Sequence, residues 1–192
     1  NPIISTRSAG EDPEAVGRLA AALVRGCQEN GMAATLKHFP GHGDTALDSH
    51  TTLATVGGDR ARLERVELRP VRYGIEAGVE AIMTAHLFVP ALDPTPGLPA
   101  TLSPVIMTDL LRKQLNFRGV LVTDAMEMGG ITKTFGDAEA AVRAVKAGVD
   151  MVLLPLDPPS AIEAIVREVS SGGIPESRID DSVRRVLRLK AR

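Results

Sequence analysis

Residues 31–50 read GMAATLKHFPGHGDTALDSH, a short apolar run that ends in a polar loop. The apolar part, Met32–Leu36, is typical of a buried strand, and the loop holds one lysine, three histidines and two aspartates. Titratable side chains directly after a buried strand are typical of an active site in α/β enzymes. The alternative is a solvated loop in which Pro40, Gly41 and Gly43 only turn the chain. The concentration of histidine and aspartate favours a site.

The pattern of a glycine followed by a short apolar run occurs four times in the chain. Runs that are apolar almost throughout predict parallel strands buried on both faces. A helical pattern precedes each run, and two more helical patterns follow the last one. The predicted strands follow Gly31, Gly78, Gly119 and Gly148, and the predicted helices cover 13–30, 60–77, 104–116, 137–147, 160–171 and 175–189.

This alternation of helices and strands predicts an α/β fold with a parallel sheet, either doubly wound or a (β/α)8 barrel. Lys37, His38, His86 and Asp124 all fall at the carboxyl ends of successive predicted strands, which is the barrel arrangement. No glycine-rich phosphate loop of the G-x-G-x-x-G or G-x-x-x-x-G-K-[ST] type occurs. Because a full barrel needs about 250 residues, we expect residues 1–192 to form a single domain, the C-terminal portion of a TIM-type barrel whose first strands are missing.

The amino-acid composition limits the classes of binding partner to be expected. The 22 basic and 24 acidic residues nearly balance, so nucleic acid and anionic membranes are not expected partners. No apolar stretch approaches the roughly 20 residues that span a bilayer. The chain opens at Asn1 without Met, which leaves its localisation unknown, with cytoplasmic and secreted both open. Aromatic residues make up only 3%, which favours a small pocket for one sugar or metabolite over a long polysaccharide groove.

Asp124 directly follows the buried run 120–123, so its carboxylate is expected at the rim of the sheet. A carboxylate there can be a nucleophile, a metal ligand or a helix N-cap. Gly129 and Gly130 argue against a long helix starting at once, which favours a catalytic role. Lys37 and His38 are consecutive in a strand, and such side chains normally point to opposite faces.

Asp48 and His50 form the second candidate group. At this spacing in an extended loop both side chains can point the same way, so the carboxylate can orient the imidazole and favour its protonated form. Such a pair can donate a proton and later accept one; the alternative is a structural hydrogen bond that pins the loop. Metal binding is less favoured, because no H-x-x-x-H pattern lies on a helix. The residues weighed as ligands are His38, His42, Asp44, Asp48, His50 and His86.

Three motifs resemble glycoside hydrolase family 3, and within it the β-N-acetylhexosaminidase (β-N-acetylglucosaminidase) branch. They are KHFPGHGDTALDSH at 37–50, IMTAH at 82–86 and GVLVTDAMEM at 119–128, and the opening NPIISTRSAGEDPE and the closing RIDDSVRRVLRLK are also similar to that family. The resemblance implies a retaining mechanism with a covalent glycosyl-enzyme, without metal or cofactor. It implies a small sugar substrate containing N-acetylglucosamine, such as a muropeptide in peptidoglycan turnover.

The resemblance also implies roles for single residues. Asp124 resembles the nucleophile, and His50 the general acid/base with Asp48 as its orienting partner. The β-glucosidase branch uses a glutamate from a later domain in place of this pair. The residues expected to bind substrate are Arg7, Lys37, His38, His86 and Met126. Family members also use an Asp, and usually an Arg, from earlier barrel strands, which we expect upstream of Asn1.

Two other functions remain open at this stage. An imidazole acid/base would not repel an anion as a second carboxylate would, so phosphate could replace water as the acceptor. A catalytically inactive sugar-binding fragment is the other reading. We also expect an open parallel sheet to leave the strand after Gly31 with an unpaired edge that can recruit a partner.

Overall fold

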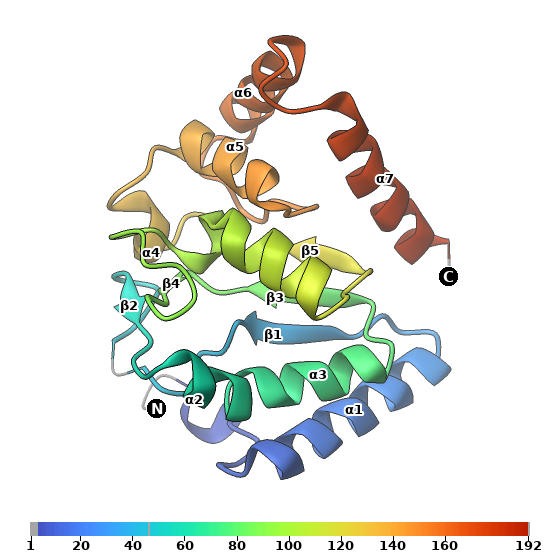
Figure 1. Cartoon of the computed structure of the whole chain (residues 1–192). Coiled ribbons are helices and arrows are strands. Elements are labelled where there is room, and N and C mark those ends of the chain that lie inside the picture. The colour runs from blue at the N-terminus through green and yellow to red at the C-terminus, as the bar shows by residue number, and fades with distance from the viewer. Residues whose placement is uncertain (1–3, 46, 192) are drawn as a thin grey trace.

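The computed structural model describes residues 4–45 and 47–191 (Figure 1). Helices alternate with short strands along the chain. In order, the elements are the 3₁₀ turn η1 Ser5–Arg7, α1 Pro13–Glu29, β1 Thr35–Phe39, β2 Ala54–Thr55, α2 Arg60–Arg65, α3 Leu68–Glu76, β3 Ala81–Thr84, β4 Leu87–Phe88, the 3₁₀ turn η2 Ala100–Leu102, the π-helix η3 Val105–Gln114, β5 Val120–Val122, α4 Gly129–Thr132, α5 Asp137–Ala147, α6 Pro158–Ser170 and α7 Glu176–Lys190.

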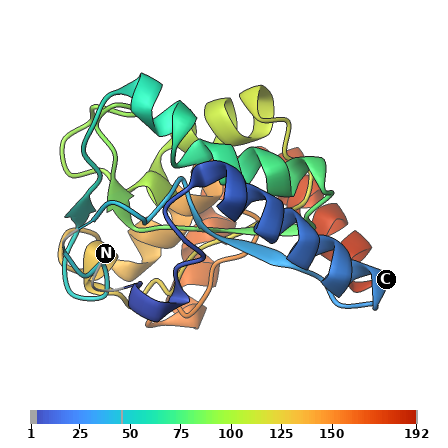
Figure 2. The ribbon, with the colours of Figure 1, turned by 90° about the horizontal axis from the view of Figure 1, so that it is seen from below.

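The main sheet has the order β1-β3-β5, and both neighbouring pairs are parallel. The strand order follows the chain without reversal, so right-handed crossovers put the connecting helices on one face. Figure 2 shows α3 and η3 on the same side of the sheet. A doubly wound sheet reverses its strand order and has helices on both faces. The predicted α/β fold, part of a barrel with outer helices, is therefore confirmed, and the sheet is not closed within the described residues.

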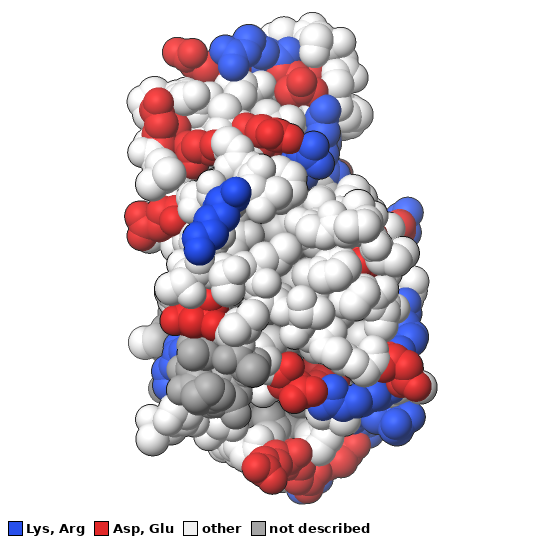
Figure 3. Space-filling view, turned by 90° about the vertical axis from the view of Figure 1, so that its left-hand side faces the viewer, with Lys and Arg blue, Asp and Glu red and all other residues white. Residues whose placement is uncertain are grey.

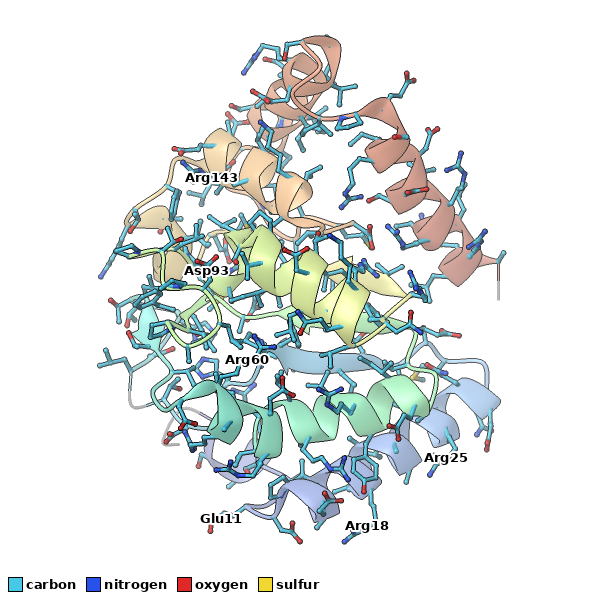
Figure 4. The ribbon with its side chains drawn as sticks, viewed as in Figure 1. Glu11, Arg18, Arg25, Arg60, Asp93 and Arg143 are labelled. Carbon is cyan, nitrogen blue, oxygen red and sulfur yellow. The ribbon has the colours of Figure 1, made fainter. Side chains whose placement is uncertain are left out.

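The helices pack through apolar stripes, and α1 packs mainly on α3. In α1, Gly17, Ala21 and Val24 are buried, and Arg18 and Arg25 lie along its outer side (Figure 4). This helix begins where the sequence predicts, because the Asp12 side chain accepts the Glu14 N–H and Pro13 takes the first helical position. The residues of η3 that cover β3 and β5 form the centre of the core, with Ile106, Met107, Leu110 and Leu111 at most 2% exposed.

Two predicted elements differ from the structure. The predicted helix 60–77 is split into α2 and α3, which starts at Leu68 with Pro70 in its first turn, where a missing N–H is tolerated. The strand predicted after Gly148 forms only a single bridge, Val122 with Met151. Beyond that bridge, the Leu153 N–H bonds to the Thr123 hydroxyl in place of a backbone carbonyl.

Among the residues that the structure describes, the sheet is open at β1, which pairs only with β3. Unlike β3 and β5, this strand alternates in burial, and Thr35 and Lys37 are exposed. Leu23 on the adjacent α1 is also largely exposed, at 61%. The predicted unpaired edge is present, and its pairing with a partner stays a prediction. Within the described residues no helix combines the length and the apolar character that crossing a membrane requires.

Candidate active site

The carboxyl ends of β1, β3 and β5 point to one face of the molecule, where β2, β4 and α4 also lie (Figure 1). Seen from that side, the centre of the face carries few acidic or basic side chains, and most of the charge lies toward its two ends (Figure 3). The candidate residues reach this face from three separate loops, as a barrel rim predicts.

Lys37 and His38 occupy an irregularity in β1. In the pairing with β3, Leu36 lies opposite Ile82 and Phe39 opposite Thr84, so β1 has one residue more than its partner over this step. Such a bulge re-aims side chains near active sites. It resolves the expected conflict of consecutive residues on opposite faces: Lys37 is exposed, and His38 turns toward Asp124. The peptide bonds Lys37–His38 and Phe39–Pro40 are both cis.

The His38 imidazole is the nearest basic group to Asp124. Its Nε2 lies 3.5 Å from Asp124 Oδ2, and the two side chains are 11% and 19% exposed. Burial lowers the pKa of His38 to about 4, and the nearby Asp124 carboxylate opposes this shift only in part. The charges of Lys37 and Arg7 lower the same pKa. His38 is therefore neutral at neutral pH and can act as a hydrogen-bond donor beside Asp124.

The Asp124 carboxylate makes few contacts with the described residues. Its Oδ1 accepts the N–H of Ala125 at 2.9 Å, and Oδ2 faces His38 at the longer distance. The segment that follows is fixed more firmly: the Ala125 carbonyl accepts a hydrogen bond from His86 Nε2 at 3.0 Å, and the Met126 N–H donates to Leu153 at 2.9 Å. One carboxylate oxygen is thus left for a ligand on a rigid strand end.

His86 and Met126 lie beneath the rim, at 0% and 1% exposure. Burial lowers the pKa of His86, so the ring is neutral with its proton on Nε2, facing the Ala125 carbonyl. Nδ1 faces the Thr101 hydroxyl at 2.9 Å. The sequence predicts that both residues bind substrate, and this stays a prediction. In the structure their contacts are with protein, and they support the loop after Asp124 from below.

Asp48 and His50 come together as predicted. His50 donates to Asp48 Oδ1 through Nδ1 at 2.6 Å and through its backbone N–H at 2.9 Å. These hydrogen bonds lower the pKa of Asp48, the backbone one most. The imidazole is 61% exposed, so Nε2 is left for exchange with a ligand or water. The pair therefore has the geometry of an oriented proton donor and acceptor.

The loop that carries the pair is organised by His42, which the sequence had singled out only as a metal ligand. His42 is 7% exposed; its Nδ1 lies 2.7 Å from Thr45 Oγ1 and its Nε2 2.9 Å from Ser49 Oγ. Burial lowers its pKa. The loop begins at Gly41, whose φ of 144° and close approach to Glu67 both require glycine. His42 thus contacts Thr45, which precedes Asp48, and Ser49, which follows it.

The loop with the Asp48–His50 pair is tied directly to the segment after Asp124. The Gly129 N–H donates to the His50 carbonyl at 2.8 Å, and the Gly130 N–H donates to the Ser49 carbonyl at 3.2 Å. The structure therefore brings Asp124, Lys37, His38, Asp48 and His50 to one rim. Within residues 4–45 and 47–191, no three His, Cys, Asp or Glu side chains come together in a way that could hold a metal ion.

Comparison with known proteins agrees with this architecture. The sequence model of the glycosyl hydrolase family 3 N terminal domain matches residues 1–189. The chain belongs to glycoside hydrolase family 3. A β-hexosaminidase A of Pseudoalteromonas piscicida is 43% identical over 166 residues, which cover 81% of the chain and 28% of that protein. The family resemblance predicted from the three motifs is confirmed.

Two solved structures of the family extend the comparison. A family 3 β-N-acetylglucosaminidase from Paenibacillus sp. is 50% identical with a TM-score of 0.96, covering 100% of this chain and 37% of that one. A β-glucoside phosphorylase is 32% identical with a TM-score of 0.90, covering 96% of this chain and 34% of the other. The chain therefore spans less than half the length of these relatives.

Proposed function

We propose that this chain carries the catalytic centre of a retaining β-N-acetylhexosaminidase that releases terminal β-linked N-acetylglucosamine. The observation that carries the proposal is the hydrogen-bonded link between the loop with Asp48 and His50 and the segment after Asp124. A lightly held carboxylate, Asp124, and an oriented acid/base pair, His50 with Asp48, are fixed to each other through the amides of Gly129 and Gly130. The names of the β-hexosaminidase and β-N-acetylglucosaminidase relatives agree with this function.

In the first step, Asp124 attacks the anomeric carbon while the bond from that carbon to the leaving oxygen breaks. The doubly protonated His50 ring gives its Nε2 proton to the leaving oxygen and keeps its Nδ1 proton, through which Asp48 fixes the orientation of the ring. In the second step, His50 removes a proton from water, the water oxygen attacks the same carbon, and the Asp124 carboxylate leaves. The sugar keeps its anomeric configuration.

In this proposal Lys37, His38 and Arg7 bind the substrate. Lys37 is exposed at the rim, and His38 faces Asp124 as a neutral donor. Arg7, in η1, is close enough for its charge to lower the pKa of His38. We assign these three to the sugar hydroxyls. His86 and Met126 act indirectly, by holding the segment after Asp124.

The test measures release of aryl alcohol from aryl N-acetyl-β-glucosaminides by the full-length protein. His50→Ala should slow a substrate with a poor leaving group by about 10²-fold or more and one with a dinitrophenol leaving group far less, because only the poor leaving group needs the proton. Equal slowing on both substrates would remove His50 from the acid role. A wild-type protein that binds the sugar but releases nothing would support the inactive sugar-binding fragment.

Phosphorolysis is the second candidate, and the charge around Asp124 favours it. The charges of Lys37 and Arg7 lower the pKa of His38 beside Asp124, and the proposed acid/base is an imidazole where a second carboxylate would repel an incoming anion. One structural neighbour is a β-glucoside phosphorylase. The two reactions separate in phosphate buffer: phosphorolysis yields the sugar 1-phosphate, and hydrolysis yields the free sugar at a rate independent of phosphate.

A further inference from the structure

The residues that fix the acid/base loop to the Asp124 segment are two glycines without a reactive side chain. Gly129 is the first residue of α4, so its N–H and that of Gly130 have no partner within the helix. They donate to the His50 carbonyl at 2.8 Å and to the Ser49 carbonyl at 3.2 Å. The backbone of the loop thus rests on the start of α4, and the His50 imidazole stays exposed.

The contact leaves no room for a side chain. A Cβ added at Gly129 would lie 2.6 Å from the Thr51 carbonyl oxygen and 3.0 Å from that of His50. At Gly130 it would lie 3.0 Å from the Ser49 carbonyl oxygen and from His86 Cβ. Carbonyl oxygens cannot rotate away as the end of a side chain can, so the loop itself would have to move. Neither glycine has a positive φ, so close approach, and not backbone conformation, requires glycine here.

We call the contact of Gly129 and Gly130 with Ser49 and His50 the seat of the loop. The segment that leads into α4 is itself fixed by hydrogen bonds. Between Asp124 and Gly129, the Ala125 carbonyl is held by His86 and the Met126 N–H by Leu153. On the other side, the Asp48 carboxylate holds both the ring and the backbone N–H of His50. In the described residues, the backbone hydrogen bonds between these two units are those of the two glycines.

We propose that Gly129 and Gly130 are positioning residues that set the distance from Asp124 to the acid/base pair; this rests on the proposed function. A side chain at either position would lift the loop from α4 and separate His50 from the sugar, and Asp124 would keep its place. The expected defect is therefore loss of proton transfer with the nucleophile intact, larger at Gly129 than at Gly130 because its contacts are closer.

A structural measurement tests the seat without reference to activity. Hydrogen exchange of peptides covering 47–52 is compared in the wild type, Gly129→Ala, Gly130→Ala and the control Gly136→Ala. Gly136 has no atom within 4 Å of an added Cβ and an ordinary φ of −67°, so this alanine meets nothing. Exchange in the loop should quicken at least tenfold in Gly129→Ala, less in Gly130→Ala and not in the control. Unchanged exchange in Gly129→Ala would overturn the proposal.

Kinetics with the same variants test the consequence. On a poor leaving group Gly129→Ala should lose about 10²-fold in kcat/KM, and on a dinitrophenyl glycoside less than tenfold, as for His50→Ala. Azide, which needs no general base, should restore turnover of the dinitrophenyl substrate by attacking the anomeric carbon of the glycosyl-enzyme, releasing Asp124 and forming the glycosyl azide. Equal losses on both substrates without azide rescue would overturn the positioning role. A wild type inactive on both would refute the proposed function instead, and the exchange result would still decide the seat.

Discussion

Asp124 follows the carboxyl end of β5, and Asp150 accepts a hydrogen bond from Leu121 within β5; the two aspartates differ in the number of groups that hold them. Asp150 is 0% exposed and accepts from the Leu121 N–H, Ser182, Arg112 and Arg185 at 2.6–2.9 Å. Asp124 is 19% exposed and accepts only its neighbour's N–H, with His38 at 3.5 Å. A carboxylate with every lone pair used stabilises the fold, and one left with a free oxygen is available for chemistry.

The two aspartates also differ in what surrounds them. Around Asp150, burial lowers the pKa of Arg112 to about 10, yet the guanidinium stays charged at neutral pH and remains an ion-pair partner. Around Asp124, burial lowers the pKa values of His38, His42 and His86, so those rings are neutral. The fold thus pairs its structural carboxylate directly with permanent cations, whereas the basic group that faces the candidate nucleophile is the neutral His38 ring.

The largest effect is expected at Asp124. Asp124→Asn removes the proposed nucleophile, so turnover of an aryl N-acetyl-β-glucosaminide should fall about 10⁴-fold, roughly 5.4 kcal/mol in the barrier. The asparagine oxygen can still accept the Ala125 N–H, so the melting temperature should stay within about 2 °C of the wild type. Near-normal turnover would remove Asp124 from the mechanism, and a large fall in melting temperature would make it a structural residue like Asp150.

Asp150→Asn should show the opposite pattern. Removing this charge leaves Arg112, Arg178 and Arg185 without their buried partner, and breaking such a cluster typically costs about 3–5 kcal/mol in the free energy of unfolding. Asp180→Asn, which removes a surface pair with Arg184, is the matched control, with an expected loss below about 1 kcal/mol. Urea unfolding measures both. A loss at Asp150 no larger than at Asp180 would contradict the structural role of Asp150 and its contrast with Asp124.

The pH dependence of stability tests the neutral histidines. The unfolded chain binds a proton on each of His38, His42 and His86 below about pH 6.5. In the folded chain protonation of these three rings is disfavoured, because burial lowers their pKa values. Stability should therefore be full above pH 6.5 and fall as the pH drops below it, by up to about 1.4 kcal/mol per pH unit for each histidine. His86→Gln should reduce that slope by one proton. Urea midpoints that stay constant from pH 7.5 to 5.5 would contradict the neutral state.

The sequence predicts the helices of this fold better than its strands. Helix α5 has the bounds that the apolar spacing and Gly148 predict, since capping and periodicity are local signals. Strands β2 and β4 have two residues each, too few to show a pattern. The segment after Gly148 has an apolar composition but uses the Thr123 side chain as a partner, which only the tertiary structure reveals.

The site residues also differ in how far the sequence alone predicts their arrangement. Asp48 and His50 are two residues apart, and their pairing is confirmed because so short a separation leaves little freedom. The burial of His86 and Met126 depends on how β3 and β5 meet their loops, which no local pattern reveals. The seat at Gly129 and Gly130 was visible in the sequence only as a pair of helix-breaking residues. Their contact with Ser49 and His50, about 80 positions earlier in the chain, is not a sequence signal.

Among the variants at the candidate site, the smallest expected effect is that of Ser49→Ala, in the loop that carries Asp48 and His50. Ser49 is 3% exposed and its hydroxyl lies 2.9 Å from His42 Nε2, so the variant removes one buried hydrogen bond and should lose about 1 kcal/mol of stability. The Ser49 carbonyl still accepts the Gly130 N–H, so the ratio of activities on poor and good leaving groups should not change. Thermal melting and the two-substrate assay measure both quantities. A loss above about 3 kcal/mol would show that this loop is held as tightly as the Asp150 cluster, and the contrast between a saturated structural side and a lightly held reactive rim would fail.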